Sequence, residues 1–185
     1  MKTGRIDKIE ALYSHGGLVY HTGDLANLWG VTNENTLYTT IKRYCQKGVL
    51  HRIQKGMYSI KPLHQLDPWL IGVKALHRYA YVSTETVLVE AGVITQIQPY
   101  ITIVSSLSTE FEIAGHHYKC RQLQDRYLYQ SVGIEARNGV NVATPQRALS
   151  DLLYFNPQVY LDDIQAIKRL KVKALQKEMG YRVSA

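Results

Sequence analysis

The sequence is poor in the features that mark secreted, membrane and disulfide-stabilised proteins. Its 185 residues include two cysteines, Cys45 and Cys120, which do not form a short Cys-Cys spacing. This count argues against a disulfide framework and makes a reducing, cytoplasmic setting the expectation. No apolar run approaches the ~20 residues that a membrane-spanning helix needs, so we expect no membrane association. Residues 1–8 are charged and are not followed by the apolar stretch of a secretory signal.

Recognisable catalytic and cofactor-binding motifs are also missing. The chain has no Gly-x-x-x-x-Gly-Lys-Ser/Thr, Gly-x-Gly-x-x-Gly, Gly-x-Ser-x-Gly or His-Glu-x-x-His pattern. The pair His116 and His117, with Cys120 nearby, is a metal-like cluster, but adjacent strand residues point to opposite faces and would not meet at one ion. Glu110 and Glu112 match no nuclease motif. We therefore predict a protein that is not an enzyme and that binds no cofactor or metal.

Basic residues outnumber acidic residues at both ends of the chain. Residues 1–61 carry nine basic and four acidic side chains, a net charge of +5, and residues 162–185 carry six and three, a net +3. Residues 62–161 carry seven basic and eight acidic side chains, a net −1. Positive charge at the two ends of a chain with a neutral middle favours a polyanionic partner such as nucleic acid.

The pattern of apolar residues predicts a winged helix-turn-helix domain in residues 1–61. Six elements are expected, in the order helix, strand, helix, helix, strand, strand: 5–15, 18–20, 23–29, 33–47, 49–53 and 57–60. Thr22 is expected to cap the second helix, and Gly30 permits the tight turn before the third. Gln54, Lys55 and Gly56 form the hairpin loop. Three helices followed by a β-hairpin are typical of a winged helix, which in some proteins is instead a protein-interaction module.

The third predicted helix carries the main functional signal. At 100° per residue, Leu37, Ile41 and Tyr44 fall on one side and form a core stripe. The opposite side has no acid and no large apolar residue, whereas a solvated surface usually mixes both charge signs. It consists of side chains that hydrogen-bond base edges and phosphates. These are Asn35, Thr36, Thr39, Lys42, Arg43 and Gln46.

This face is predicted to enter the major groove of double-stranded DNA. Asn35 and Arg43 are the expected base-reading residues, because their planar groups can bond adenine or guanine edges in a bidentate manner. Lys42 is expected to contact phosphate. In the predicted hairpin, Arg52 and Lys55 are expected to contact the flanking backbone or the minor groove.

Residues 62–185 predict an α+β domain that begins at Pro62. Helices are expected at 68–77, 84–91, 145–153, 160–170 and 172–179. Short strands are expected at 81–83, 100–104, 111–113, 117–119, 127–129, 133–135 and 140–142. Ser83 or Thr84 is expected to cap the helix at 84–91, and Thr144 is expected to cap the helix at 145–153. Four basic residues near the end are equally compatible with a second phosphate-binding patch and with a solvated helix face: Lys168, Arg169, Lys171 and Lys173.

Four segments, taken in order, carry a family resemblance. They are 48–58 (GVLHRIQKGMY), 81–88 (YVSTETVL), 100–104 (YITIV) and 143–153 (ATPQRALSDLL). This set resembles the AbiEi-type antitoxins of type IV, or abortive infection, toxin–antitoxin systems. The resemblance implies a transcriptional autorepressor that binds inverted repeats upstream of its own operon. It also implies that the domain at 62–185 antagonises a nucleotidyltransferase toxin without forming a stable complex with it.

Two other functions remain open from the sequence. The chain is also compatible with a regulator whose second domain binds a small effector and has no antitoxin activity. A nuclease that uses the winged helix only for targeting is the weaker alternative, because no set of residues forms a recognisable catalytic site.

Overall fold

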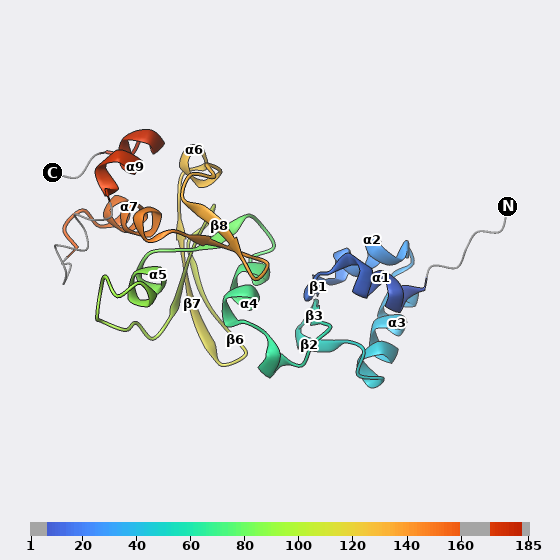
Figure 1. Cartoon of the computed structure of the whole chain (residues 1–185). Helices are drawn as coiled ribbons and strands as arrows, with labels where there is room; N and C mark the ends of the chain where they lie inside the picture. The colour runs from blue at the N-terminus through green and yellow to red at the C-terminus, as the bar shows by residue number, and fades with distance from the viewer. Residues whose placement is uncertain (1–6, 160–170, 183–185) are drawn as a thin grey trace. The chain divides into compact units, whose positions relative to one another are not determined.

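The computed structural model describes residues 7–159 and 171–182 (Figure 1). The chain divides into two compact units, Met1–Ile71 (unit 1) and Gly72–Ala185 (unit 2). The division falls inside helix α4 (Pro68–Ala75), whereas the sequence suggests a boundary after Lys61. Each unit combines helices with a β-sheet, so the predicted α+β class is confirmed. No helix in the described parts of the chain has the length and apolar character needed to cross a membrane.

Unit 1 contains three helices and a three-stranded sheet in the predicted order. The elements are α1 (Lys8–His15), β1 (Val19–His21), α2 (Thr22–Trp29), α3 (Glu34–Gln46), β2 (His51–Gln54) and β3 (Met57–Ser59). All strand pairs are antiparallel, and β3 lies in the middle of the sheet. A short 3₁₀ turn at Leu63–Gln65 leads to α4.

Local hydrogen bonds define where these helices begin. The Asp7 carboxylate accepts the backbone N–H groups of Ile9 and Glu10 at the start of α1. The Asn33 side chain accepts the N–H of Thr36, at 3.0 Å, at the start of α3. Thr22, the expected cap of α2, is instead the first residue of that helix.

The helices of unit 1 bury one apolar face against the sheet. Its core contains residues from all three helices and from the sheet: Leu12, Tyr20, Leu25, Trp29, Leu37, Ile41, Tyr44, Leu50 and Tyr58. The Trp29 and Tyr44 rings meet edge to face, with centroids 5.5 Å apart. In α1, only Leu12 of the periodic apolar residues is buried, since Ile9 and Tyr13 are exposed.

Unit 2 is built on a six-stranded mixed sheet. Its strands are β4 (Ala80–Val82), β5 (Ile101–Ser105), β6 (Thr109–Ile113), β7 (His116–Gln122), β8 (Ile134–Arg137) and β9 (Val140–Ala143). Their order across the sheet is β6-β7-β5-β4-β9-β8, in which β5–β7 and β4–β9 are parallel pairs. The helices are α5 (Glu85–Glu90), α6 (Asp125–Leu128), α7 (Pro145–Phe155) and α9 (Val172–Met179). The helix expected at 160–170 lies outside the described residues.

Helices lie on both faces of this sheet (Figure 1). On β5, Thr102 faces α5 and exchanges hydrogen bonds with Thr86. The next residue, Ile103, faces the opposite side, where it lies close to Gly72 of α4. A side chain at Gly72 would place its Cβ 2.2 Å from the Tyr118 ring, so only glycine allows α4 to approach the sheet this closely.

Three local expectations for unit 2 can be compared with the structure. Thr144 caps α7 as predicted, because its hydroxyl accepts the N–H of Arg147 at 3.3 Å. Thr84 precedes α5 but makes no capping hydrogen bond through its side chain. The strand predicted at 127–129 is wrong. Tyr127 and Leu128 belong to α6 and both are buried, which the alternating sides of a half-exposed strand do not allow.

Candidate nucleic-acid interface

Helix α3 presents its polar face to solvent. Leu37, Ile41 and Tyr44 are at most 8% exposed, which confirms the predicted core stripe. On the other side of the helix, all five residues expected to face DNA are exposed, as is Gln46 beside them: Asn35, Thr36, Thr39, Lys42 and Arg43. The structure therefore brings these side chains together on one exposed face of α3.

Tyr38 is a further exposed residue of α3 that the sequence pattern did not single out. Its side chain is 53% exposed, although most large aromatic residues of unit 1 are buried. It lies next to Thr39 on the helix, at the margin of the polar face. A helical wheel places this tyrosine between the two faces and so does not decide whether it is buried.

The hairpin formed by β2 and β3 has its tip attached to α2. Gly56 has a φ of +77°, a conformation that favours glycine, and the pairing of the strands shifts by one residue between Arg52 and Gln54. The Gly56 carbonyl accepts two hydrogen bonds from Thr22, one from its backbone N–H at 3.0 Å and one from its side-chain hydroxyl at 3.3 Å. These bonds fix the tip, so the exposed Lys55 side chain extends from an anchored loop.

Arg52 lies on β2, at the junction of the hairpin with α3. Its Nε donates to the Gln54 carbonyl at 3.4 Å. Burial raises the pKa of Tyr58, and the positive charge of Arg52 partly offsets this rise. Burial likewise raises the pKa of Cys45 on α3, again with an opposing effect of Arg52. The guanidinium is thus close enough to act electrostatically on both the hairpin and α3.

The exposed surface of α3 and the hairpin is strongly basic. It carries Lys42, Arg43, Lys47, Arg52 and Lys55, all of them exposed. The only acid from Asn33 to Lys61 is Glu34, in the first turn of α3. A basic surface of this kind attracts polyanions, and its amide and hydroxyl groups can hydrogen-bond bases or phosphates.

The other sequence-based candidates lie in unit 2 or outside the described residues. Lys168 and Arg169 are outside them, while Lys171 and Lys173 are exposed at the start of α9. Nothing in the described parts of the chain brings together three or more side chains of His, Cys, Asp or Glu in a way that could hold a metal ion. Cys120 is buried, which raises the pKa of its thiol to about 12.

The acids considered for a nuclease site lie opposite basic side chains across β6 and β7. Glu110 lies 3.3 Å from the Lys119 ammonium, and Glu112 lies 3.6 Å from the His117 ring. These four residues occupy opposing positions in the antiparallel pair. Cross-strand pairing of opposite charges, as between Glu110 and Lys119, is an ordinary way to stabilise an exposed sheet edge.

A buried polar network in unit 2 was not foreseen from the sequence. Arg147 and Asp151, one turn apart on α7, are fully buried and form an ion pair of 2.9 Å. The Asp151 carboxylate also accepts the hydroxyls of Tyr81, Ser83 and Tyr181, at 2.7–3.0 Å. Burial raises the pKa of Asp151, and the Arg147 charge opposes this rise.

The remaining donors of Arg147 are satisfied by the backbone and by Tyr81. Its guanidinium donates to the Tyr81 hydroxyl and to the carbonyls of Tyr127, Gln130 and Val132, at 2.8–3.2 Å. The network joins segments 81–88 and 143–153, two of the four that carry the family resemblance. The sequence signal for it is the i, i+4 spacing of an arginine and an aspartate on one side of a predicted helix.

The chain has a distant structural similarity to a protein of known structure. No protein-family model matches the chain, and no curated protein matches it in sequence. The fold resembles the crystal structure of the RV2827C protein from Mycobacterium tuberculosis, with 13% sequence identity and a TM-score of 0.48. The match covers 79% of this chain and 58% of that protein, so the chain spans less than two thirds of its neighbour. A similarity at this level supports no conclusion about function.

Proposed function

We propose that unit 1 is a winged helix-turn-helix domain and that the protein is a DNA-binding transcriptional autorepressor. In this proposal α3 is the recognition helix and the β2–β3 hairpin is the wing. The observation that carries it is the exposed face of α3, which holds polar and basic side chains without an acid and lies on the same unit as a basic hairpin. Such a surface suits DNA better than an apolar protein partner.

The proposed docking places α3 in the major groove of double-stranded DNA. Arg43 and Asn35 read base edges there, while Lys42 and the hydroxyls of Thr36 and Thr39 position the helix. The Asn33 cap supports this arrangement, because it satisfies the first turn of α3 and leaves the Asn35 side chain available.

The wing contacts the DNA backbone or minor groove beside the recognition helix. Lys55 projects from the anchored tip of the hairpin, and Arg52 lies nearer to α3. Anchoring lowers the entropy that an otherwise mobile loop would lose on binding. The attachment of Gly56 to Thr22 should therefore favour DNA binding by the hairpin.

The test is binding to the DNA upstream of the protein's own gene, compared with scrambled DNA of equal length, across a salt series. A preference of about a thousandfold at physiological salt is expected for a sequence-specific repressor. Equal and steeply salt-dependent binding to both would reduce the role of unit 1 to electrostatic attraction. Absence of binding would identify it as a protein-interaction module.

We further propose that the protein is the antitoxin of a type IV toxin–antitoxin system. This part rests on the resemblance to AbiEi-type antitoxins carried by the four segments described above. The expected antagonist is a nucleotidyltransferase encoded beside this gene, and unit 2 is expected to carry the antagonism. Co-expression with that enzyme should restore growth, and Arg43→Ala should retain the rescue while losing repression. Growth arrest that persists with the wild-type protein would remove the antitoxin role and leave the repressor.

A further inference from the structure

Tyr38 of α3 exposes a large aromatic ring beside the residues proposed to contact DNA. Its side chain is 53% exposed. It lies three residues after Asn35 and four before Lys42, so the three side chains are neighbours on the helix surface. Within the described part of the chain, no hydrogen bond or ring contact holds the Tyr38 side chain. The ring is therefore open to a partner of α3, and covering it is favourable because apolar surface leaves water.

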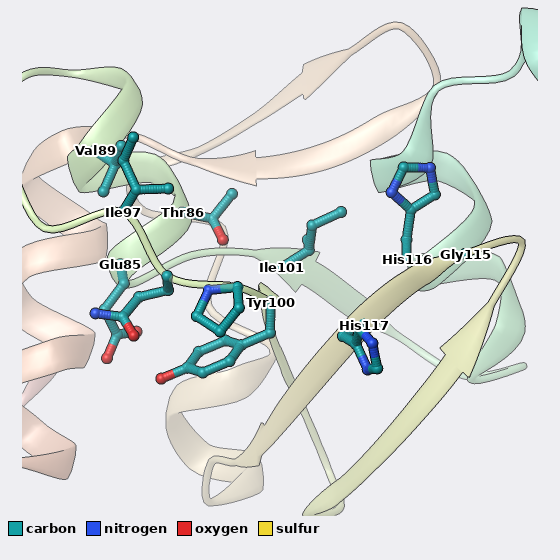
Figure 2. Close-up of a pocket in the computed structure, with 11 residues that line it drawn as sticks. Glu85, Thr86, Val89, Ile97, Tyr100, Ile101, Gly115, His116 and His117 are labelled. Atoms are coloured by element: carbon teal, nitrogen blue, oxygen red, sulfur yellow. The ribbon is translucent and has the colours of Figure 1, made fainter.

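Tyr100 of unit 2 is a partly exposed tyrosine in a different environment. Figure 2 shows it in a hollow beside α5, between Glu85 on one side and His117 on the other. The Lys119 ammonium lies over its ring, 5.2 Å from the centroid. The Tyr100 ring thus already has a cationic partner. The ring of Tyr38 has no such partner among the described residues, which leaves it open to an external contact.

Charges of opposite sign flank Tyr38 on its own helix. Glu34 lies one turn before it and Lys42 one turn after it, and both are exposed. Residues four apart are neighbours on a helix surface, so the negative charge of Glu34 offsets the attraction that Lys42 exerts on a phosphate near this ring. What distinguishes Tyr38 from the other residues of the outer face is therefore its apolar ring and not its charge environment.

The major groove of DNA offers one apolar group to such a ring. Base edges there present hydrogen-bond donors and acceptors, and thymine adds a 5-methyl group. Contact between this methyl group and an apolar or aromatic side chain is one of the ways in which proteins recognise thymine. Asn35, the neighbour of Tyr38, suits adenine. The thymine paired with that adenine presents its methyl group in the same groove, close to the proposed position of the ring.

We propose that Tyr38 is a specificity-determining residue that recognises a thymine through its 5-methyl group. The ring covers the methyl group, while Asn35 and Arg43 hydrogen-bond to neighbouring base edges. This inference rests on the proposed docking of α3 in the major groove and gives that docking a base preference. It adds an apolar contact to a face whose other members recognise DNA by hydrogen bonds and charge.

The experiment replaces each thymine of the bound upstream DNA with deoxyuridine, one at a time. This exchange removes the 5-methyl group and keeps every hydrogen-bonding group of the base. Fluorescence anisotropy with the full chain measures the affinity. At one thymine in each half of the operator, the wild-type protein is expected to bind about fourfold more weakly, the effect of one methyl group left in water. Tyr38→Ala is expected to bind the thymine and deoxyuridine forms equally, and the thymine form several-fold more weakly than the wild type does.

Two further variants separate the ring from the hydroxyl and from general effects. Tyr38→Phe keeps the ring, so it should keep both the affinity and the preference for thymine over deoxyuridine. Tyr13→Ala makes the same change as Tyr38→Ala at a tyrosine of α1 that is 59% exposed, and should bind as the wild type does. Tyr38→Ala should melt at or above the wild-type temperature, because the side chain is exposed and alanine favours a helix.

The outcomes separate this inference from the proposed function. A wild-type protein without preference for the upstream DNA contradicts the proposed function, and this inference fails with it. A wild-type protein that prefers the upstream DNA, with the same response to every deoxyuridine in Tyr38→Ala, overturns this inference alone. A loss of affinity in Tyr38→Phe as large as in Tyr38→Ala would indicate a contact between the hydroxyl and a phosphate, and would also overturn it.

Discussion

The two units of this protein place their polar side chains in opposite ways. In unit 1, the amide, hydroxyl and cationic side chains on the polar face of α3 are exposed. In unit 2, Arg147 and Asp151 of α7 are buried, and hydroxyls and carbonyls from three other segments surround them. The exposed groups are available to a partner, whereas the buried ones stabilise the fold. Substitutions in the two sets should therefore affect different properties.

The largest expected effect is on the stability of unit 2. Asp151→Ala leaves the buried Arg147 without a counter-charge and removes the acceptor of three hydroxyls. We expect a loss of about 3–5 kcal/mol in the free energy of unfolding, measured by urea denaturation. The control is Glu90→Gln, which breaks an exposed ion pair with Arg137 and should cost under about 1 kcal/mol. Equal losses in the two variants would mean that the network does not hold unit 2 together.

The next effect concerns DNA recognition by unit 1. Arg43→Ala should weaken binding to the operator by about 1–3 kcal/mol and relax the preference for it over scrambled DNA. Its unfolding free energy should stay close to wild type, because the Arg43 side chain is exposed and its guanidinium lies over the Tyr44 ring, 5.5 Å from the centroid. Lys177→Ala, at an exposed position of unit 2, is the control and should bind DNA normally. Unchanged operator preference in Arg43→Ala would contradict the docking of α3.

A smaller effect tests the attachment of the β2–β3 hairpin, the proposed wing, to α2. Thr22→Val removes the hydroxyl bond to the Gly56 carbonyl but leaves the backbone bond in place. We expect a loss of about 1 kcal/mol in the stability of unit 1 and a several-fold loss of DNA affinity, since the tip is held less firmly. Calorimetric melting measures the loss of stability, and fluorescence anisotropy measures the loss of DNA affinity. Full DNA affinity in this variant would show that the wing does not need its anchor.

The smallest effect separates phosphate contact from base contact. Lys55→Ala should weaken binding to all DNA sequences alike, by a few-fold at physiological salt. The slope of log K against log salt should fall by about 0.9, the contribution of one phosphate contact. Anisotropy titrations at four salt concentrations, with Lys177→Ala as the reference, measure this slope. A change in sequence preference instead would assign Lys55 to base recognition.

Unit 1 was the more predictable of the two from the sequence. Its helices are amphipathic, so the spacing of Leu37, Ile41 and Tyr44 identifies the buried side of α3 and, by exclusion, the exposed one. The same pattern misled for α1, where Ile9 and Tyr13 have helical spacing but remain exposed. Periodicity shows which residues share a face, but only packing decides how much of that face is covered.

In unit 2 the strands expected from the sequence overlap all six strands of the sheet. The sequence did not predict the buried hydrogen-bond network around Arg147 and Asp151. A strand was expected at 127–129, but Tyr127 and Leu128 belong to helix α6. The prediction failed because a run of three residues is too short for periodicity to distinguish a strand from a helix. The partners of Arg147 could not be identified either. Tyr81 and Tyr181 lie on opposite sides of it in the chain, 66 residues before and 34 after, as their numbers show.

The sequence by itself determined the α+β class, the order of elements in unit 1 and the residues on the outer face of α3. These depend on local spacing, capping and turn residues, which act over a few positions of the chain. Only the tertiary structure decided the burial of Arg147 with Asp151, the attachment of Gly56 to Thr22, and the hydrogen bonds between Thr86 and Thr102. Each of these depends on segments that meet after folding, because burial and long-range hydrogen bonds are properties of the packed chain.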